Sequence, residues 1–117
     1  MGQNYKIIIE YDGSNYSGWQ VQKNTRQTIQ QKLEDALSRI NKKRVEVTGA
    51  GRTDAGVHAA GQTANFFLDV DIPTEKIPIA LNTELPADII CKKAEKVGAD
   101  FHARYDARGK KYRYRIL

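Results

Sequence analysis

Hydrophobic and polar positions follow two periodicities along this chain, and each change of periodicity marks the boundary of an expected strand or helix. Short apolar runs, and alternation with a period of two, are typical of strands. Such patterns predict strands at residues 5–11, 44–48, 62–68, 89–97 and 110–117. In the second of these strands, Val45 and Val47 are expected to share one face.

Apolar residues spaced three and four apart predict a helix instead. This helix is expected to begin after Thr28, and Gln31 stands where a capping box requires it. Its expected core face consists of Ile29, Leu33, Ala36, Leu37 and Ile40.

A short second helix is expected to begin at Pro73 and Thr74 and to end within residues 82–86. Its apolar residues Ile77 and Leu81 are expected to face the core. Pro78 is compatible with this helix because it falls near the first turn, where a missing N–H costs nothing.

The resulting order is strand, helix, strand, strand, helix, strand, followed by one more strand. This order predicts an α+β fold of the ferredoxin-like, RNA-recognition-like type, a split βαβ whose antiparallel sheet carries both helices on one face. Residues 1–117 are expected to form a single domain, and the open face of the sheet is expected to be free to bind RNA. The final strand ends on Ile116 and Leu117 without a turn, so we expect a chain that is cut short.

Composition narrows the class of protein. The chain has 117 residues, of which 40% are hydrophobic and 28% charged, as in soluble globular domains. No apolar run approaches the roughly 18 residues of a membrane helix, and the N-terminus lacks the core of a signal peptide, so a cytoplasmic protein with no membrane contact is expected. Cys91 is the only cysteine, which excludes an internal disulfide and predicts an apolar strand residue.

Positive charge gathers near the C-terminus of a chain whose net charge is +5. Basic groups can neutralise phosphates, and aromatic rings between them can stack on bases. Between residues 101 and 116 these residues are Arg104, Arg108, Lys110, Lys111, Arg113 and Arg115, with Tyr105, Tyr112 and Tyr114 among them. The same pattern also fits the solvated face of an exposed strand.

The glycine-rich segment Gly49–Ala59, GAGRTDAGVHA, is the most unusual part of the chain. A dinucleotide-binding loop is excluded because neither the third glycine nor the following helix is present. A metal site is not expected, since only His58 and His102 could join Asp54. Asp54 could act as a lone carboxylate that Arg52 keeps ionised, or could simply form an Asx-turn with its own backbone.

The same segment resembles the active-site motif of the tRNA pseudouridine synthase A family. Further stretches resemble the family in the expected order, so that the resemblance extends over nearly the whole chain. They are YDGSNYSGWQVQ at 11–22, TIQQKLEDAL at 28–37, Gly61-Gln62, ALNTELPADI at 80–89 and FHARYDARGKKYRYRI at 101–116.

The resemblance implies a role for each of several residues. Asp54 would be the catalytic aspartate that starts cleavage of the uridine C–N glycosidic bond, by attack on the ribose, attack on the base or abstraction of a sugar proton. Arg52 would pair with Asp54 and help hold the flipped nucleotide, and Tyr112 would lie against its base. Candidate RNA contacts are Trp19, which could instead anchor its loop, and His102, Arg104, Lys110, Lys111 and Arg113.

The resemblance also implies a substrate and partners. Family substrates are uridines at positions 38, 39 and 40 of the tRNA anticodon stem-loop, and the reaction requires neither cofactor nor metal. Family members are about twice as long, and their active site lies between two related halves. We therefore expect this chain to be the catalytic-aspartate half without its C-terminal half, inactive by itself or completed by a second copy, and to form a dimer or higher oligomer.

Two other classes of function fit the same sequence. The first is a non-catalytic RNA-binding module of the RNA-recognition type, in which Asp54→Ala would leave RNA affinity unchanged or improve it. The second is a structural protein that uses the open sheet to contact another protein. A failure to bind structured RNA at low salt would favour the second.

Overall fold

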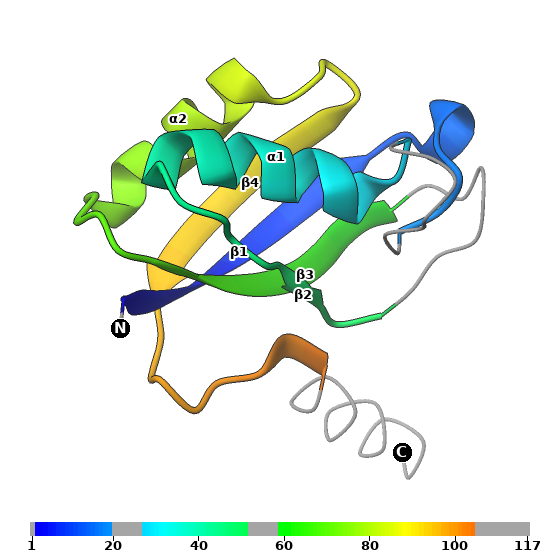
Figure 1. Cartoon of the computed structure of the whole chain (residues 1–117). Helices are drawn as coiled ribbons and strands as arrows, with labels where there is room; N and C mark the ends of the chain where they lie inside the picture. The colour runs from blue at the N-terminus through cyan, green and yellow to red at the C-terminus, as the bar shows by residue number, and fades with distance from the viewer. Residues whose placement is uncertain (1, 20–26, 52–58, 105–117) are drawn as a thin grey trace, which may run out of the picture.

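A computed structural model describes residues 2–19, 27–51 and 59–104 of the chain. Four strands form one antiparallel sheet in the order β2-β3-β1-β4 (Figure 1). The strands are β1 (Gln3–Tyr11), β2 (Thr48–Gly49), β3 (Ala59–Leu68) and β4 (Ile89–Lys96). The helices α1 (Ile29–Asn41) and α2 (Ile77–Glu84) lie on the same face of the sheet, and the predicted split βαβ fold is confirmed.

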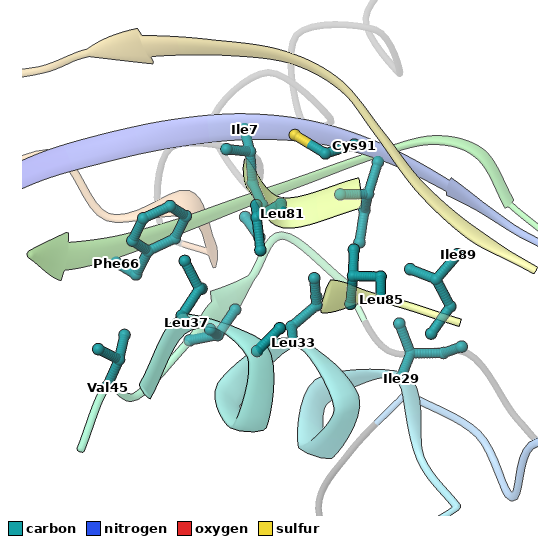
Figure 2. Packing of buried hydrophobic residues seen from close by; sticks show 14 of the residues in the cluster. Ile7, Ile29, Leu33, Leu37, Val45, Phe66, Leu81, Leu85, Ile89 and Cys91 are labelled. Atoms are coloured by element: carbon teal, nitrogen blue, oxygen red, sulfur yellow. The ribbon is translucent and has the colours of Figure 1, made fainter. Parts of the chain in front are cut away.

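The core lies between this face and the two helices. Alternate residues of β1 point into it, and Tyr5, Ile7 and Ile9 are completely buried. In Figure 2, Leu33 and Leu37 are directed from α1 toward the sheet, as their helical spacing predicts. Each buried side chain of this size contributes about 1.5–3 kcal/mol of transfer free energy, so the apolar face of α1 is a major source of stability.

The N-terminus of α1 is formed as the sequence predicts. Thr28 is extended, and its hydroxyl oxygen accepts a hydrogen bond from Gln31 N at 3.2 Å. The side chain of Gln31 donates to Asp35 Oδ1 at 3.0 Å. The helix ends at Asn41 and is capped by Lys42, whose φ of 59° places it in the left-handed region.

The second helix begins later than predicted. A short 3-10 turn, η2 (Thr74–Lys76), precedes α2, so that Pro78 falls at the start of the α-helix. A proline is tolerated there because the first N–H groups of a helix have no partner within the helix. Ile77 and Leu81 are buried, which confirms their predicted direction.

The predicted strand 44–48 is wrong in its extent, because β2 contains only Thr48 and Gly49. Val45 and Val47 are both buried, so the alternation itself was interpreted correctly. The backbone of this stretch bonds to α1 instead of to β3. Val45 N donates to Ser38 Oγ at 2.9 Å, and Val47 N donates to Glu34 Oε2 at 3.0 Å. Gln30 Nε2 donates to Val47 O at 2.8 Å.

The opposite face of the sheet is not fully open. After β4, residues 97–104 turn beneath the sheet, on the side away from α1 and α2 (Figure 1). The RNA-binding face expected from the sequence is therefore partly covered by the protein's own chain. The predicted fifth strand at 110–117 lies outside the described residues.

Candidate active site

The glycine-rich segment joins two neighbouring antiparallel strands, and its first residues are fixed to β3. Gly49 pairs with Ala64 in the sheet. Ala50 N donates to Thr63 O at 2.8 Å, and Gln62 Nε2 donates to Gly51 O at 2.6 Å. The chain rejoins the sheet at Ala59, the first residue of β3. The segment that carries Asp54 is thus attached at both ends to the sheet.

Trp19 packs against Gly49, the first residue of the glycine-rich segment, from the helix side of the sheet. Its side chain is 1% exposed, and its ring lies 6.3 Å from that of Tyr11. A Cβ atom at Gly49 would lie only 2.5 Å from Cζ2 of the indole, so only glycine fits beneath it. Of the two roles left open by the sequence, anchoring accounts for this burial, and the indole has little surface left to contact RNA.

Asp88, in the turn before β4, holds the segment that leads to Trp19. Its carboxylate accepts a hydrogen bond from the Tyr16 hydroxyl, and its backbone oxygen accepts one from Asp12 N at 3.0 Å. Burial, together with the hydrogen bond and charge of Asp88, raises the pKa of Tyr16 above its usual range. The phenol therefore remains a donor at any physiological pH. Sequence reasoning missed Asp88, because an aspartate in a turn is ordinary.

Two buried asparagines hold the chain beneath the sheet. Asn4 and Asn65 are 1% and 4% exposed. Asn65 Nδ2 donates to Asn4 Oδ1 at 3.1 Å, while Asn65 Oδ1 accepts from Ala103 N at 2.9 Å. Asn4 Nδ2 donates to the backbone oxygens of Gly98 and Phe101 at 2.9 and 3.1 Å. These bonds fix the place at which His102 and Arg104 lie.

A hollow of about 580 Å³ opens between this segment and the edge of the sheet. It is lined by residues from 44–48, 65–67 and 99–102, and His102 is among them. His102 and Arg104 are both half-buried, and Arg44 lies at the rim with its side chain 73% exposed. Arg44 Nη2 lies 3.8 Å from Glu46 Oε2, and an exposed pair of this kind contributes at most about 1 kcal/mol.

A family model described as tRNA pseudouridine synthase matches residues 7–106, which include the glycine-rich segment, Trp19 and Asp88. The chain belongs to this family.

Proteins named tRNA pseudouridine synthase A are similar to it over nearly its whole length. The one from Acetivibrio thermocellus is 52% identical over 114 residues, which are 97% of this chain and 46% of that protein. The one from Ruminiclostridium cellulolyticum is 53% identical over 111 residues, or 95% of this chain and 45% of that protein. The one from Caldicellulosiruptor saccharolyticus is 53% identical over 114 residues, again 97% and 46%. The chain thus spans a little under half the length of these relatives.

The predicted site residues divide into two groups in this member of the tRNA pseudouridine synthase family. Trp19, His102 and Arg104 are described, and the structure does not bring Trp19 together with the other two, which lie on the other face of the sheet. The remaining predicted residues lie outside the described part of the chain. These are Arg52, Asp54, Lys110, Lys111, Tyr112 and Arg113.

The described part of this family member shows features of neither a metal centre nor a cysteine nucleophile. Within residues 2–19, 27–51 and 59–104, no three histidine, cysteine, aspartate or glutamate side chains gather into a group able to hold a metal ion. Burial raises the pKa of the Cys91 thiol to about 11, so this cysteine is a poor nucleophile. No helix among these residues has the length and apolar character needed to cross a bilayer.

Proposed function

We propose that this chain forms the catalytic-aspartate half of a tRNA pseudouridine synthase, an isomerase that converts uridine to pseudouridine in tRNA. The observation that carries the proposal is the family match over residues 7–106, which contains the whole segment Gly49–Ala59. The attachment of that segment to β2 and β3 supports it, because a catalytic group needs a rigid frame.

Asp54 is the proposed catalytic residue. Its carboxylate starts cleavage of the bond between the ribose and N1 of the uracil, and Arg52 keeps this carboxylate ionised. The base must leave the helical stack before it can turn, and Tyr112 lies against it in that position. The ribose then bonds to C5 of the base, C5 loses its proton and N1 gains one. No electrons are gained or lost overall, so no redox cofactor is needed.

The proposed substrate is the anticodon stem-loop of tRNA, in the cytoplasm. The net charge of +5 favours a polyanionic partner. His102 and Arg104, which Asn65 helps to hold beneath the sheet, are proposed contacts to the RNA backbone. Lys110, Lys111 and Arg113 extend the same basic stretch along the sequence.

A further partner completes the site in this proposal. The chain matches only 46% of the length of its Acetivibrio thermocellus relative, so we propose that the site requires either a second half or a second copy of this chain. Light scattering distinguishes these possibilities for the chain by itself. A dimer or larger mass is expected, and a monomer mass at micromolar concentration would leave the second half as the required partner.

The decisive experiment measures pseudouridine formation in unmodified tRNA. The purified chain, and the chain joined to the uncovered half of its Acetivibrio thermocellus relative, are each incubated with tRNA. Uridines of the anticodon arm are then read by pseudouridine-specific modification and primer extension. Turnover is expected from the joined protein, and Asp54→Ala is expected to abolish it.

Asp54→Asn is the matched control, since it keeps the size of the side chain and removes only its charge. Both variants are expected to bind tRNA about as tightly as the parent. If both the chain by itself and the joined protein, each without substitution, bound tRNA but formed no pseudouridine, the proposal would be contradicted. That result would favour the non-catalytic RNA-binding module.

A further inference from the structure

The first turn of α1 holds the backbone of Trp19 firmly. Gln30 N donates to Trp19 O at 2.9 Å, and Ile29 N donates to Gly18 O at 3.2 Å. Gly18 has a φ of 104°, a conformation that residues with a side chain rarely adopt. The backbone of Trp19 is therefore held by the start of α1, and the position of its indole is set by the helix and not by the glycine-rich segment.

The indole of Trp19 packs directly against the backbone of Gly49, the last residue of β2. The indole atoms Cζ2, Cε2 and Nε1 would lie 2.5, 2.6 and 2.9 Å from a Cβ atom at Gly49. On the other side, the hydrogen bonds from Ala50 N and Gln62 Nε2 hold the chain to β3. Gly49 is thus packed against the aromatic ring, while hydrogen bonds hold Ala50 and Gly51 to β3.

Asp88 adds a second support to the segment before Trp19. It accepts hydrogen bonds from the Tyr16 hydroxyl and from Asp12 N, and so ties residues 12–16 to the turn before β4. Tyr16 is itself 6% exposed and Asp88 is half-buried, so the hydrogen bond is partly shielded from water. A neutral acceptor of the same shape could replace the carboxylate in this role.

We propose that Trp19 is a positioning residue for the glycine-rich segment, and that Asp88 acts through Tyr16 to keep Trp19 in place. The inference rests on the proposed function, because it assigns the segment after Gly51 to catalysis. Asp54 follows Gly49 by only five residues, and a displacement of about 1 Å at a catalytic group can cost about a hundredfold in rate. Neither Trp19 nor Asp88 needs to touch the RNA.

Amide hydrogen exchange tests the positioning without any assay of activity. In the purified chain, Trp19→Leu and Asp88→Ala are expected to speed exchange at Ala50 by at least about tenfold, because its bond to Thr63 O opens more often. Exchange at Ile7, in the centre of β1, is expected to speed up less than exchange at Ala50, because Ile7 responds only to the loss of global stability. Unchanged exchange at Ala50 in both variants overturns the proposal.

Turnover tests the consequence, in the same joined protein that tests Asp54. Gly49→Ala and Trp19→Leu are each expected to lower kcat at least about tenfold with little change in KM for tRNA. The double variant removes the ring that the new methyl group would strike, so it is expected to be more active than Gly49→Ala alone. Losses that simply multiply in the double variant would overturn the proposal.

Conservative variants separate positioning from general damage. Asp88→Asn keeps an acceptor for Tyr16 and is expected to retain kcat, whereas Asp88→Ala is expected to lose it. Ile79→Ala changes a side chain that is 68% exposed and is expected to match the parent in both measurements. If the parent itself forms no pseudouridine, the proposed function fails, and exchange at Ala50 alone then decides whether Trp19 and Asp88 position the segment.

Discussion

Glu34, on α1, accepts a hydrogen bond from Val47 N in the stretch that leads into β2, and it is only 7% exposed. Burial raises the pKa of its carboxyl above the ordinary glutamate value, against the lowering effects of the Val47 N–H and of Arg44. The neighbouring acids Glu46 and Asp35 raise it further. The folded protein therefore holds the Glu34 proton more tightly than the unfolded chain does.

The sign of this shift gives a prediction for stability. A raised pKa means that the contribution of Glu34 is fully present at low pH and is lost as pH rises through the raised value. Glu34→Gln keeps an oxygen that can accept from Val47 N but cannot ionise. Its free energy of unfolding, relative to the parent, is expected to increase as pH rises from about 4.3, the ordinary glutamate pKa, toward 7.

Urea unfolding at several pH values measures this difference. Glu75→Gln is the matched control, because that side chain is exposed and lies in η2, and its replacement is expected to leave the profile nearly unchanged. Parallel profiles for Glu34→Gln and the parent would contradict the prediction.

Individual site residues differ in how far the sequence could identify them. The motif around Asp54 is a local pattern, so the sequence can present it as a candidate without any structure. The role of Trp19 depends on what lies beneath its ring, and the sequence therefore left two roles open. The side chain of Asp88 becomes significant through Tyr16, 72 residues earlier in the chain, and no local pattern reports such a contact.

At the scale of elements, α1 was predictable because its pattern and its cap are both local. Thr28 is fully buried, and its hydroxyl oxygen satisfies one of the N–H groups that a helix leaves unpaired at its start. The stretch at 44–47 was not predictable, since side chains of α1 take the backbone bonds that a strand partner would have made. Alternation reports which side chains are buried but not which groups bond to the backbone.

The cap of α1 gives a prediction at this scale. Thr28→Ala is expected to lower the free energy of unfolding by about 1 kcal/mol, within a range of roughly 0.5–2 kcal/mol, because Gln31 N loses its acceptor. Thr28→Ser retains the oxygen and is expected to retain most of the stability. Urea denaturation measures both, and equal losses would assign the effect to the lost methyl group instead of the cap.

At the scale of the whole molecule, excess positive charge attracts RNA over a longer range than any direct contact does. The net charge is +5, while several lysines of the described part are already paired, among them Lys92 with Glu10 at 3.2 Å and Lys6 with Glu95 at 3.6 Å. Unpaired cations contribute to RNA affinity by releasing counterions from phosphates. Binding is therefore expected to weaken steeply with salt.

This expectation can be measured by titrating tRNA at increasing salt. With about five phosphate contacts and a slope of about 0.7 per contact, affinity is expected to fall about a hundredfold between about 50 and 200 mM salt. Arg104→Gln is expected to reduce the slope by about one contact, and Ile79→Ala to leave it unchanged. An affinity independent of salt would exclude a phosphate-dominated interface.

The central strand β1 precedes both of its partner strands in the chain, so it is synthesised before either partner is available to pair with it. Its partners are β3, at Ala59–Leu68, and β4, at Ile89–Lys96. Because residues 12–96 must be added before both partners exist, a ribosome working at about 5–20 residues per second leaves this strand incomplete for roughly 4 to 17 seconds. During that interval the nascent chain presents Tyr5, Ile7 and Ile9 to the cell as unburied apolar surface, and chaperones can bind it there before the sheet closes.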